Sequence, residues 1–384
     1  MNTKLIEKFS QEISNCINSE NISLYWKGRV ALYALLKAMG IKANDEIIIP
    51  AYTCVVVPNA ILYLGAKPIY IDVSSDHYNM DINLIKRAIT PKTKVIICQN
   101  TYGLSSNLEE LTTLAKEHNI YTIEDCTHGF GGYYNNIPNG QSCDAAIYST
   151  QWNKPFSTGI GGFAITTNKK INDKLTALNS ELISPSSKEL LNLKILYIVH
   201  RYLINNLTYW PLVQLYRWLS QHNLVVGSSS RSEIASIEKP ERYFKAFSNT
   251  QAKEGLRTLP KLKENLIIRK KTAKTYTSYL NKHGKNHVED KWFNNHAFLK
   301  YPLLVHKRDE FMLLAEKHRI ALGEWFTSPL HPVEGDLSPW QFKQERYPVA
   351  NYLASHVVNL PTTPSNINKV LAFLEQHIEY IVDQ

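Results

Sequence analysis

Residues 121–131 read YTIEDCTHGFG, and residues 147–165 read IYSTQWNKPFSTGIGGFAI. The first piece is a β-branched run that stops at Asp125 and continues into glycines, a pattern typical of a strand that ends in a turn. The second piece is an apolar run up to Ser149, followed by one lysine, Lys154, and then a glycine-rich turn. The pattern therefore predicts two strands with Asp125, Ser149 and Lys154 at or beyond their carboxyl ends.

These residue types indicate a particular chemistry. A lysine amine forms a Schiff base with an aldehyde, and a carboxylate beside a pyridine nitrogen keeps that nitrogen protonated, so that the ring withdraws electrons. A freed lysine amine can also carry a proton, which makes one residue both an anchor and an acid–base group. Asp125 and Lys154 are thus the predicted catalytic residues of a pyridoxal phosphate enzyme. The alternatives are a surface lysine in a loop and a carboxylate that only forms a turn.

Helix and strand patterns alternate over the first third of the chain. Apolar strand patterns lie at 46–50, 68–73, 94–99 and 121–125, and helical patterns lie at 30–39, 55–64, 81–88 and 107–118. Helices between apolar strands favour an α/β fold with a parallel sheet, right-handed crossovers and ligands at the carboxyl ends of the strands. Asp125, Ser149 and Lys154 all fall at or beyond such ends.

Further motifs follow one another along the chain. They are GRVAL from Gly28, DEIIIPAYT from Asp45, GAKP from Gly65, Glu124 with Asp125, Ser149 with Lys154, TGIGG from Thr158 and NLP from Asn359. In this order and spacing the chain resembles the DegT/DnrJ/StrS sugar aminotransferase family of fold-type I pyridoxal phosphate enzymes. The resemblance extends from about residue 26 to residue 179 and resumes from about residue 248 to the C-terminus.

The resemblance implies a mixed, mostly parallel sheet between helices, with a smaller C-terminal α+β domain. It divides the chain into an N-terminal helical cap (1–25), a large cofactor-binding domain (26–250), and a linking helix with the small domain (251–384). Residues 251–279 are expected to form one long linking helix. A segment at 183–245 departs from the family, which has a shorter connection here.

The implied reaction moves an amino group from glutamate or glutamine to a keto sugar, most often a nucleotide-linked one, in a homodimer. Pyridoxal 5'-phosphate would be held through a Schiff base to Lys154. Two alternatives use the same scaffold. One is a different pyridoxal phosphate reaction such as sugar dehydration, although the dehydrating relatives replace this lysine by histidine. The other is a non-catalytic or regulatory homologue.

The cofactor phosphate is expected at Gly28 and Arg29, which open a helix whose free amides and dipole favour an anion. The family has Ser-Gly-Thr where this chain has Lys27, Gly28 and Arg29, so two cations replace two hydroxyls. We interpret this as a phosphate site kept by glycine and charge, and the alternative is a solvated basic helix start. Ser149 matches the family serine that donates to the phosphate.

The cofactor ring has its own predicted contacts. Asp125 would pair with the ring nitrogen, and His128 stands where the family has a glutamine that binds the phenolic oxygen. The alternative is that His128 is a packing residue whose hydrogen bonds are made within the protein. Tyr52 and Cys54 fall where the family places a residue over the ring.

The substrate would contact Asn100 and Tyr102, which match site-lining residues of the family, and His331, which matches a C-terminal Leu-His. In the family an Asn-x-Arg-Met stretch reaches the phosphate of the neighbouring subunit. This chain has Phe-Lys-Ala-Phe there. Lys245 is therefore expected to bind the phosphate, with Arg242 as the alternative.

Composition narrows the remaining classes. The 384 residues suggest two or so domains, and the net charge of +9 favours anionic small molecules, such as nucleotide diphosphates, or an anionic membrane surface. There is no dense basic cluster for nucleic acid and no GxGxxG after a strand for a nicotinamide cofactor. Five dispersed cysteines form neither a disulfide framework nor a CxxC metal motif, and the N-terminus has no apolar signal region. We expect a cytoplasmic protein without a metal.

Residues 190–219 are rich in Leu, Ile, Tyr and Trp and leave a broad apolar helical face. Polar residues and Pro211 argue against a transmembrane span. One interpretation is a helical lid or dimer-interface element that packs on protein. The other is an interfacial helix pair that contacts a membrane or a lipid-linked substrate.

Overall fold

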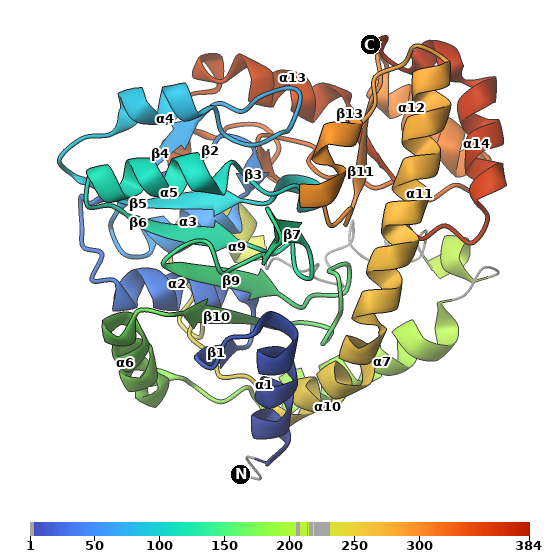
Figure 1. Ribbon diagram of the computed structural model, residues 1–384. Helices are drawn as coiled ribbons and strands as arrows, with labels where there is room; N and C mark the ends of the chain where they lie inside the picture. Colours follow the sequence, from blue (N-terminus) through green and yellow to red (C-terminus); the bar gives the residue numbers. More distant parts are fainter. Residues whose placement is uncertain (1–3, 205–207, 213, 215–217, 219–230) are drawn as a thin grey trace.

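A seven-stranded sheet forms the centre of the computed structural model, which describes residues 4–204, 208–212, 214, 218 and 231–384 (Figure 1). The strand order is β1-β10-β9-β6-β5-β2-β4. The strands from β4 to β9 run parallel, whereas β10 is antiparallel to both of its neighbours. This confirms the predicted mixed, mostly parallel sheet. The bounds are β1 (Ile22–Tyr25), β2 (Glu46–Pro50), β4 (Lys67–Ile71), β5 (Thr93–Gln99), β6 (Tyr121–Asp125), β9 (Ala145–Ser149) and β10 (Gly162–Thr166).

Helices cover both faces of this sheet, because its strands carry apolar residues at successive positions. In β2, Ile47 and Ile49 pack in the core that includes α2 and α3, whereas Ile48 packs in the core that includes α4 and α5. The strand ends are therefore the part of the sheet that the helices leave open to a ligand. The helices are α2 (Gly28–Ala38), α3 (Val56–Leu62), α4 (Ile82–Ala88), α5 (Leu108–Glu117) and α6 (Lys169–Leu178).

The predicted long helix at 251–279 is wrong in one respect, because it is interrupted. Helix α10 (Asn249–Thr258) and helix α11 (Leu262–Lys282) are separated by a 3₁₀ turn, Leu259–Lys261. Pro260 explains the break, since proline lacks an N–H donor and its ring clashes with the preceding helical turn. Figure 1 shows α11 rising from α10 along the side of the molecule.

The C-terminal part of the chain contributes to two cores. Helix α11, α12 (Arg308–Lys317) and α14 (Ile367–Gln376) enclose the antiparallel pair β11 (Tyr301–Leu304) and β13 (Val357–Leu360) in one core. The segment between β11 and β13 returns to the large sheet, where Phe326, Trp340 and Phe342 join the core of α2 and α3. There β12 (Leu330–His331) pairs with β3 (Thr53–Cys54), and α13 (Pro348–His356) follows. The predicted domain boundaries stay predictions.

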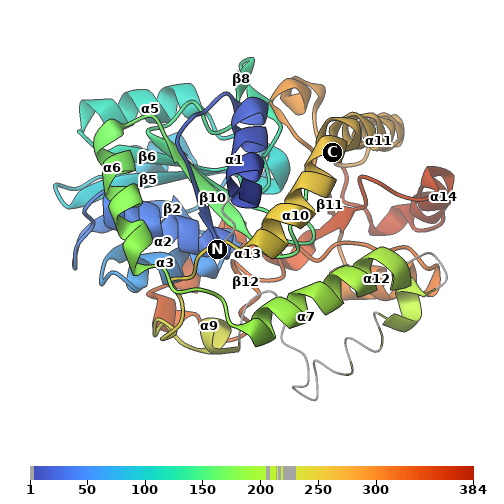
Figure 2. The same ribbon diagram turned by 90° about the horizontal axis from the view of Figure 1, so that it is seen from below.

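The N-terminal helix α1 (Lys4–Ile17) buries Phe9, Ile13 and Ile17 and packs against α10, as Figure 2 shows. Gly255 of α10 makes this close contact possible. A Cβ atom there would lie 2.3 Å from the Phe9 ring.

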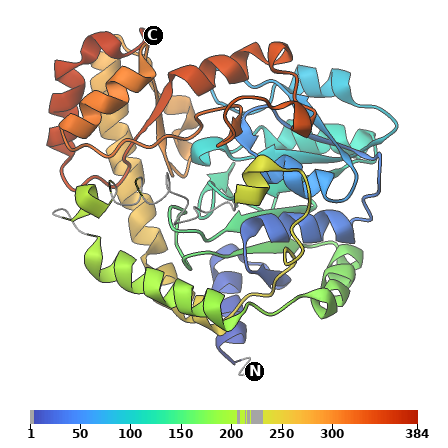
Figure 3. The ribbon, with the colours of Figure 1, turned by 180° about the vertical axis from the view of Figure 1, so that it is seen from behind.

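Helices α7 (Ser187–Ile198) and α9 (Arg231–Ala235) lie in the predicted atypical segment, and both are visible in Figure 3. Leu193 and Tyr197 of α7 pack against Trp26, while apolar side chains on its outer face are exposed. Residues 205–207, 213, 215–217 and 219–230 of this segment lie outside the described residues. Within the described ranges, no helix is long and apolar enough to cross a membrane.

Candidate active site

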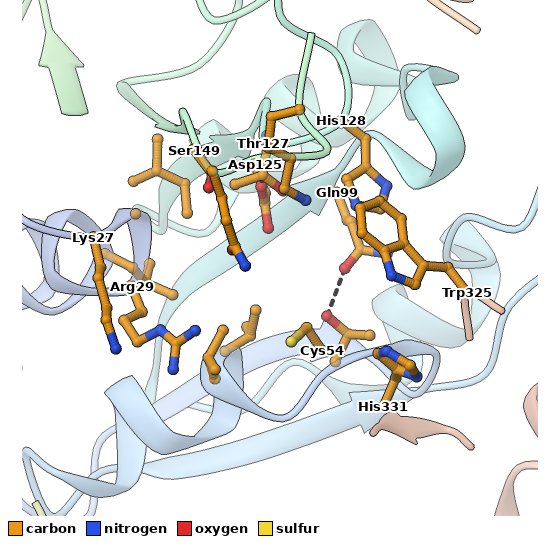
Figure 4. Close-up of a pocket in the computed structure, with 18 of the residues that line it drawn as sticks. Lys27, Arg29, Cys54, Gln99, Asp125, Thr127, His128, Ser149, Trp325 and His331 are labelled. Carbon is orange, nitrogen blue, oxygen red and sulfur yellow. Dashed lines mark hydrogen bonds between the residues drawn. The ribbon is translucent and has the colours of Figure 1, made fainter. Parts of the chain in front are cut away.

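A cavity of about 360 Å³ opens where the carboxyl ends of β6 and β9 meet the start of α2. Figure 4 shows Lys27 and Arg29 on one side of it and His128 with Trp325 on the other. The predicted site residues that line the cavity are Gly28, Arg29, Cys54, Asp125, His128, Ser149, Lys154 and His331. The fold thus brings together residues that are up to three hundred positions apart in the sequence.

Lys154 lies in the loop between β9 and β10. Its Nζ is 4.4 Å from the centroid of the Trp325 ring. Burial lowers the pKa of Lys154 to about 8, and the charges of Lys300 and Arg29 act in the same direction, against Asp125. A substantial fraction of this amine is therefore neutral near physiological pH, as a nucleophile requires.

Asp125 ends β6 with its carboxylate inside the cavity wall. The backbone N–H of Thr127 donates a hydrogen bond to Asp125 Oδ1 at 2.9 Å. Burial raises the pKa of Asp125, while this hydrogen bond and the charge of Lys154 lower it. A buried carboxylate in this position favours a cationic or protonated partner.

Gly28 brings the start of α2 against the end of β9. A Cβ atom on Gly28 would lie 3.0 Å from the Cβ of Ser149, and one on Gly162 would lie 2.3 Å from the Cα of Gly28. The two glycines let the helix N-terminus and Ser149 share one wall, which we call the phosphate wall and which also includes Lys27 and Arg29. Helix amides, a hydroxyl and two cations are the groups that bind a phosphate.

The cations of the phosphate wall have a carboxylate neighbour. Glu233 of α9 forms ion pairs with Arg29 at 2.7 Å and with Lys27 at 3.6 Å. Burial and the charge of Arg29 lower the pKa of Lys27 to about 8. Sequence patterns gave no signal for this contact, because Glu233 lies about two hundred residues from Arg29 in a segment without a recognisable motif.

His128 lies opposite this wall. Its ring stacks on Trp325 with centroids 4.8 Å apart and planes inclined by 9°. The backbone N–H of Tyr102 donates to His128 Nδ1 at 3.2 Å, so the proton of a neutral ring is on Nε2. Burial, followed by the charge of Lys154, holds the pKa of His128 well below its usual value. His128 is therefore a neutral hydrogen-bond donor.

Cys54 and His331 lie side by side on the cavity floor, because β3 and β12 pair with these two residues in register. Burial raises the pKa of the Cys54 thiol. Burial, with the charges of Arg308 and Lys154, lowers the pKa of His331 to about 4. Both side chains are therefore uncharged at neutral pH.

The remaining predicted site residues do not line the cavity. Tyr52 and Tyr102 lie behind the wall, where their hydroxyls are 2.7 Å apart and Tyr102 donates to the carbonyl of Trp325. Asn100 donates to Glu124 at 2.9 Å. Lys245 is paired with Glu189 of α7. Tyr52 and Tyr102 thus support the aromatic residues of the site from behind the cavity wall.

Several lining residues were not predicted, among them Gln99, Thr127, Trp325 and Phe326. Gln99 ends β5 and accepts a hydrogen bond from the Thr53 hydroxyl at 2.6 Å, as Figure 4 shows. The position of Gln99 at a strand end could have predicted that it lines the site. Trp325 and Phe326 reach the cavity only because the C-terminal segment returns to the large sheet, and local pattern does not reveal such a return.

Comparisons with known proteins show which family the chain resembles. A family model described as the DegT/DnrJ/EryC1/StrS aminotransferase family matches residues 1–195 and 242–372. The chain is 26% identical over 373 residues to GDP-perosamine synthase of Escherichia coli O157:H7, which covers 97% of this chain and 89% of that protein. It is 35% identical over 154 residues to a UDP-N-acetyl-3-dehydro-alpha-D-glucosamine 3-aminotransferase of Acidithiobacillus ferrooxidans, over 40% of this chain and 42% of that protein.

Solved structures have the same fold. An aminotransferase from Psychrobacter cryohalolentis matches with a TM-score of 0.75 and 19% identity, over 98% of this chain and 91% of that one. NtdA from Bacillus subtilis, with bound cofactor PMP, matches with a TM-score of 0.72 and 21% identity, over 98% of this chain and 77% of that one. At these identities the likeness establishes the fold.

Proposed function

The chain belongs to the DegT/DnrJ/EryC1/StrS aminotransferase family, and we propose that it moves an amino group from glutamate or glutamine to a keto sugar that carries a nucleotide diphosphate. One observation carries the proposal. Lys154, whose pKa is lowered to about 8, shares a buried cavity with Asp125 and with the phosphate wall. These are the groups that a pyridoxal phosphate aminotransferase needs.

The residues of the cavity fit pyridoxal 5'-phosphate, the cofactor we assign to this chain. Lys154 would bind the aldehyde, Asp125 the ring nitrogen and His128 the phenolic oxygen. The start of α2 and Ser149 would hold the phosphate, since the absence of a side chain at Gly28 lets them approach closely. Solved relatives are described in PLP and PMP forms, which supports this assignment.

When bound, the cofactor supplies an aldehyde that condenses with amines and a ring that withdraws electrons. The chain supplies proton transfer and orientation. Lys154, as a free amine, would take the proton from the donor Cα and would deliver a proton in the reverse step with the sugar. The Asp125 carboxylate would hold a proton on the ring nitrogen. His128, whose ring is held in place by stacking on Trp325, would donate its Nε2–H to the phenolic oxygen.

Two buried cations, Lys300 beside Trp325 and Arg269 near Lys300, support an anionic acceptor. Arg269 of α11 has its Nε and Nη1 buried without a hydrogen-bond partner among the described residues. Lys300 Nζ lies 5.0 Å from the Trp325 ring centroid. Burial lowers the pKa of Arg269 to about 10, and burial together with Arg269 lowers that of Lys300 to about 8. Buried cations that form no ion pair with the described residues favour a ligand that brings negative charge, as a nucleotide diphosphate does.

We further propose that two copies form a homodimer and that the enzyme works in the cytoplasm. All five cysteines are free thiols, which is typical of a reducing compartment. Leu191, Ile195 and Ile198 expose apolar surface on α7, which a second copy would cover.

An assay with purified keto sugars tests the proposed reaction. The protein, loaded with pyridoxal phosphate, is incubated with L-glutamate and either a nucleotide-linked keto sugar or the same sugar without its nucleotide. We expect 2-oxoglutarate and the amino sugar from the nucleotide-linked form, and an Arg269→Gln variant with a raised KM. Equal turnover of the free sugar would overturn the nucleotide-linked assignment. The proposed reaction itself would be overturned if no keto sugar gave an amino sugar with L-glutamate or with L-glutamine as the donor.

A further inference from the structure

A carboxylate lies against the two cations of the phosphate wall. The side chains of Glu233 and Arg29 are only 4% and 7% exposed, so their ion pair is buried. Glu233 belongs to α9, within residues 196–241, which the family model leaves unmatched. The contact is therefore a feature of this chain and does not follow from membership of the family.

One direct hydrogen bond and two supporting contacts hold Glu233 in this place. Asn59 Nδ2 of α3 donates to the backbone carbonyl of Glu233 at 2.7 Å, and Trp340 Nε1 donates to Asn59 Oδ1 at 2.6 Å. The next residue, Ile234, packs on the core of α2 and α3 and lines the cavity. Glu233 itself does not line the cavity, and its carboxylate lies against the lining residues Lys27 and Arg29, held in place by α3.

The carboxylate and a phosphate would use the same donors. In the protein without ligand, Glu233 compensates Lys27 and Arg29, and removal of a counter-ion from buried cations is strongly destabilising. A phosphate at the start of α2 would bind the same two cations through charge-assisted hydrogen bonds. Two anions on one pair of cations repel each other, so each weakens the binding of the other.

We propose that Glu233 is an internal anion that competes with the cofactor phosphate for Lys27 and Arg29 and thereby sets how tightly the protein holds phosphate-bearing ligands. The proposal rests on the proposed function, which locates the phosphate at this wall. Glu233 acts on the phosphate end of the ligand and forms no ion pair with Lys154 in the structure. It is a specificity-determining residue rather than a catalytic one.

The test compares the full-length protein with a Glu233→Gln variant. The matched control is Glu254→Gln, which removes another buried carboxylate that pairs with two arginines, Arg201 and Arg257, outside the cavity lining. Dissociation constants of pyridoxal 5'-phosphate and of pyridoxal, which lacks the phosphate, come from absorption titrations of the cofactor-free protein. Inorganic phosphate is the third probe, measured by its effect on Tm.

For Glu233→Gln we expect pyridoxal 5'-phosphate to bind about tenfold more tightly, within the usual range for coupling between two binding events, while pyridoxal binds as before. Inorganic phosphate should raise the Tm of this variant more than that of the parent protein or of Glu254→Gln. Unchanged or weaker binding of pyridoxal 5'-phosphate in a folded Glu233→Gln protein would overturn the proposal.

Two further results cover a variant that does not fold and a failure of the proposed function. If Glu233→Gln does not fold, Glu233→Asp, which withdraws the carboxylate by one methylene, should give a smaller gain in the same direction. A loss of affinity in Glu233→Asp would overturn the proposal. If pyridoxal 5'-phosphate binds to neither protein but phosphate stabilises Glu233→Gln selectively, the cofactor assignment fails while the competition at the phosphate wall is supported.

Discussion

Lys154 illustrates how neighbouring residues change the chemistry of a single side chain. A lysine in water is almost fully protonated at neutral pH and does not attack an aldehyde. Burial beside Arg29 and Lys300 disfavours the ammonium form, and Asp125 only partly opposes this effect. The sequence pattern predicted Lys154 and Asp125 as partners, because both follow strand ends. It did not reveal Trp325, which reaches the site through the return of the C-terminal segment, or Lys300, which lies just before β11.

The lowered pKa leads to a prediction about pH. Because the neutral amine is the reactive form, the rate of pyridoxal phosphate capture should rise with pH, with a midpoint near 8, and level off above it. Stopped-flow absorbance over the neutral to alkaline range measures this rate. A rate that continues to rise toward the ordinary lysine value of 10.5 would contradict the prediction.

At the scale of elements, local patterns were sufficient where one residue type marks a boundary. The strands at 46–50 and 121–125 have the predicted bounds, since each apolar run ends at a residue that interrupts it, Pro50 or Asp125. Predictions failed where a boundary depends on packing or on a single proline. Pro260 divides the expected linking helix, and the position of α9 depends on Asn59 and Trp340, which are distant in sequence.

The contact between α1 and α10 can be tested through Gly255. A Gly255→Val side chain would overlap the Phe9 ring, which is buried and stacks on Phe247 with centroids 5.6 Å apart. Overpacking of this kind should lower the free energy of unfolding by about 1–3 kcal/mol. Urea denaturation of the purified variant measures the change. A Phe9→Leu substitution in the same chain should restore part of the loss, and stability equal to the parent would contradict the packing described.

Helix α7 carries a second testable surface at this scale. Leu191, Ile195 and Ile198 are 58%, 50% and 57% exposed, and their spacing places them on neighbouring parts of one helical face. Replacing all three by serine should convert a dimer into a monomer, because the apolar contact between the copies is lost. Light scattering after gel filtration measures the mass.

Two outcomes would contradict this assignment of the α7 face. One is a dimer of unchanged stability in the triple variant. The other is that the parent protein co-sediments with anionic lipid vesicles and the triple variant does not. That result would assign the face to a membrane surface. Vesicles of neutral lipid provide the control for the contribution of charge.

At the scale of the whole molecule, the fold and the family were accessible from the order of short motifs along the chain. Each motif marks a place where a strand end or a helix start meets the cofactor, and such places follow from local sequence. The substitution of Lys27 and Arg29 for hydroxyl residues was also visible. Its counterpart, Glu233, was not, because its contact with these cations depends on how a segment outside the family pattern folds back. The same applies to Arg269 and Lys300, whose proximity results from the packing of α11 near β11.

The central claim is that Lys154 binds pyridoxal phosphate and performs an amino transfer with it. The most direct measurement is the absorption spectrum of the purified, cofactor-loaded protein before and after addition of L-glutamate or L-glutamine. A Lys154→Ala variant is measured alongside, with Lys170→Ala, an exposed lysine, as the matched control. We predict a visible cofactor band that an amino donor converts to the pyridoxamine form in the parent and in Lys170→Ala, and no such conversion in Lys154→Ala. A protein that shows no cofactor band after loading, or a band that neither donor changes, would contradict the claim.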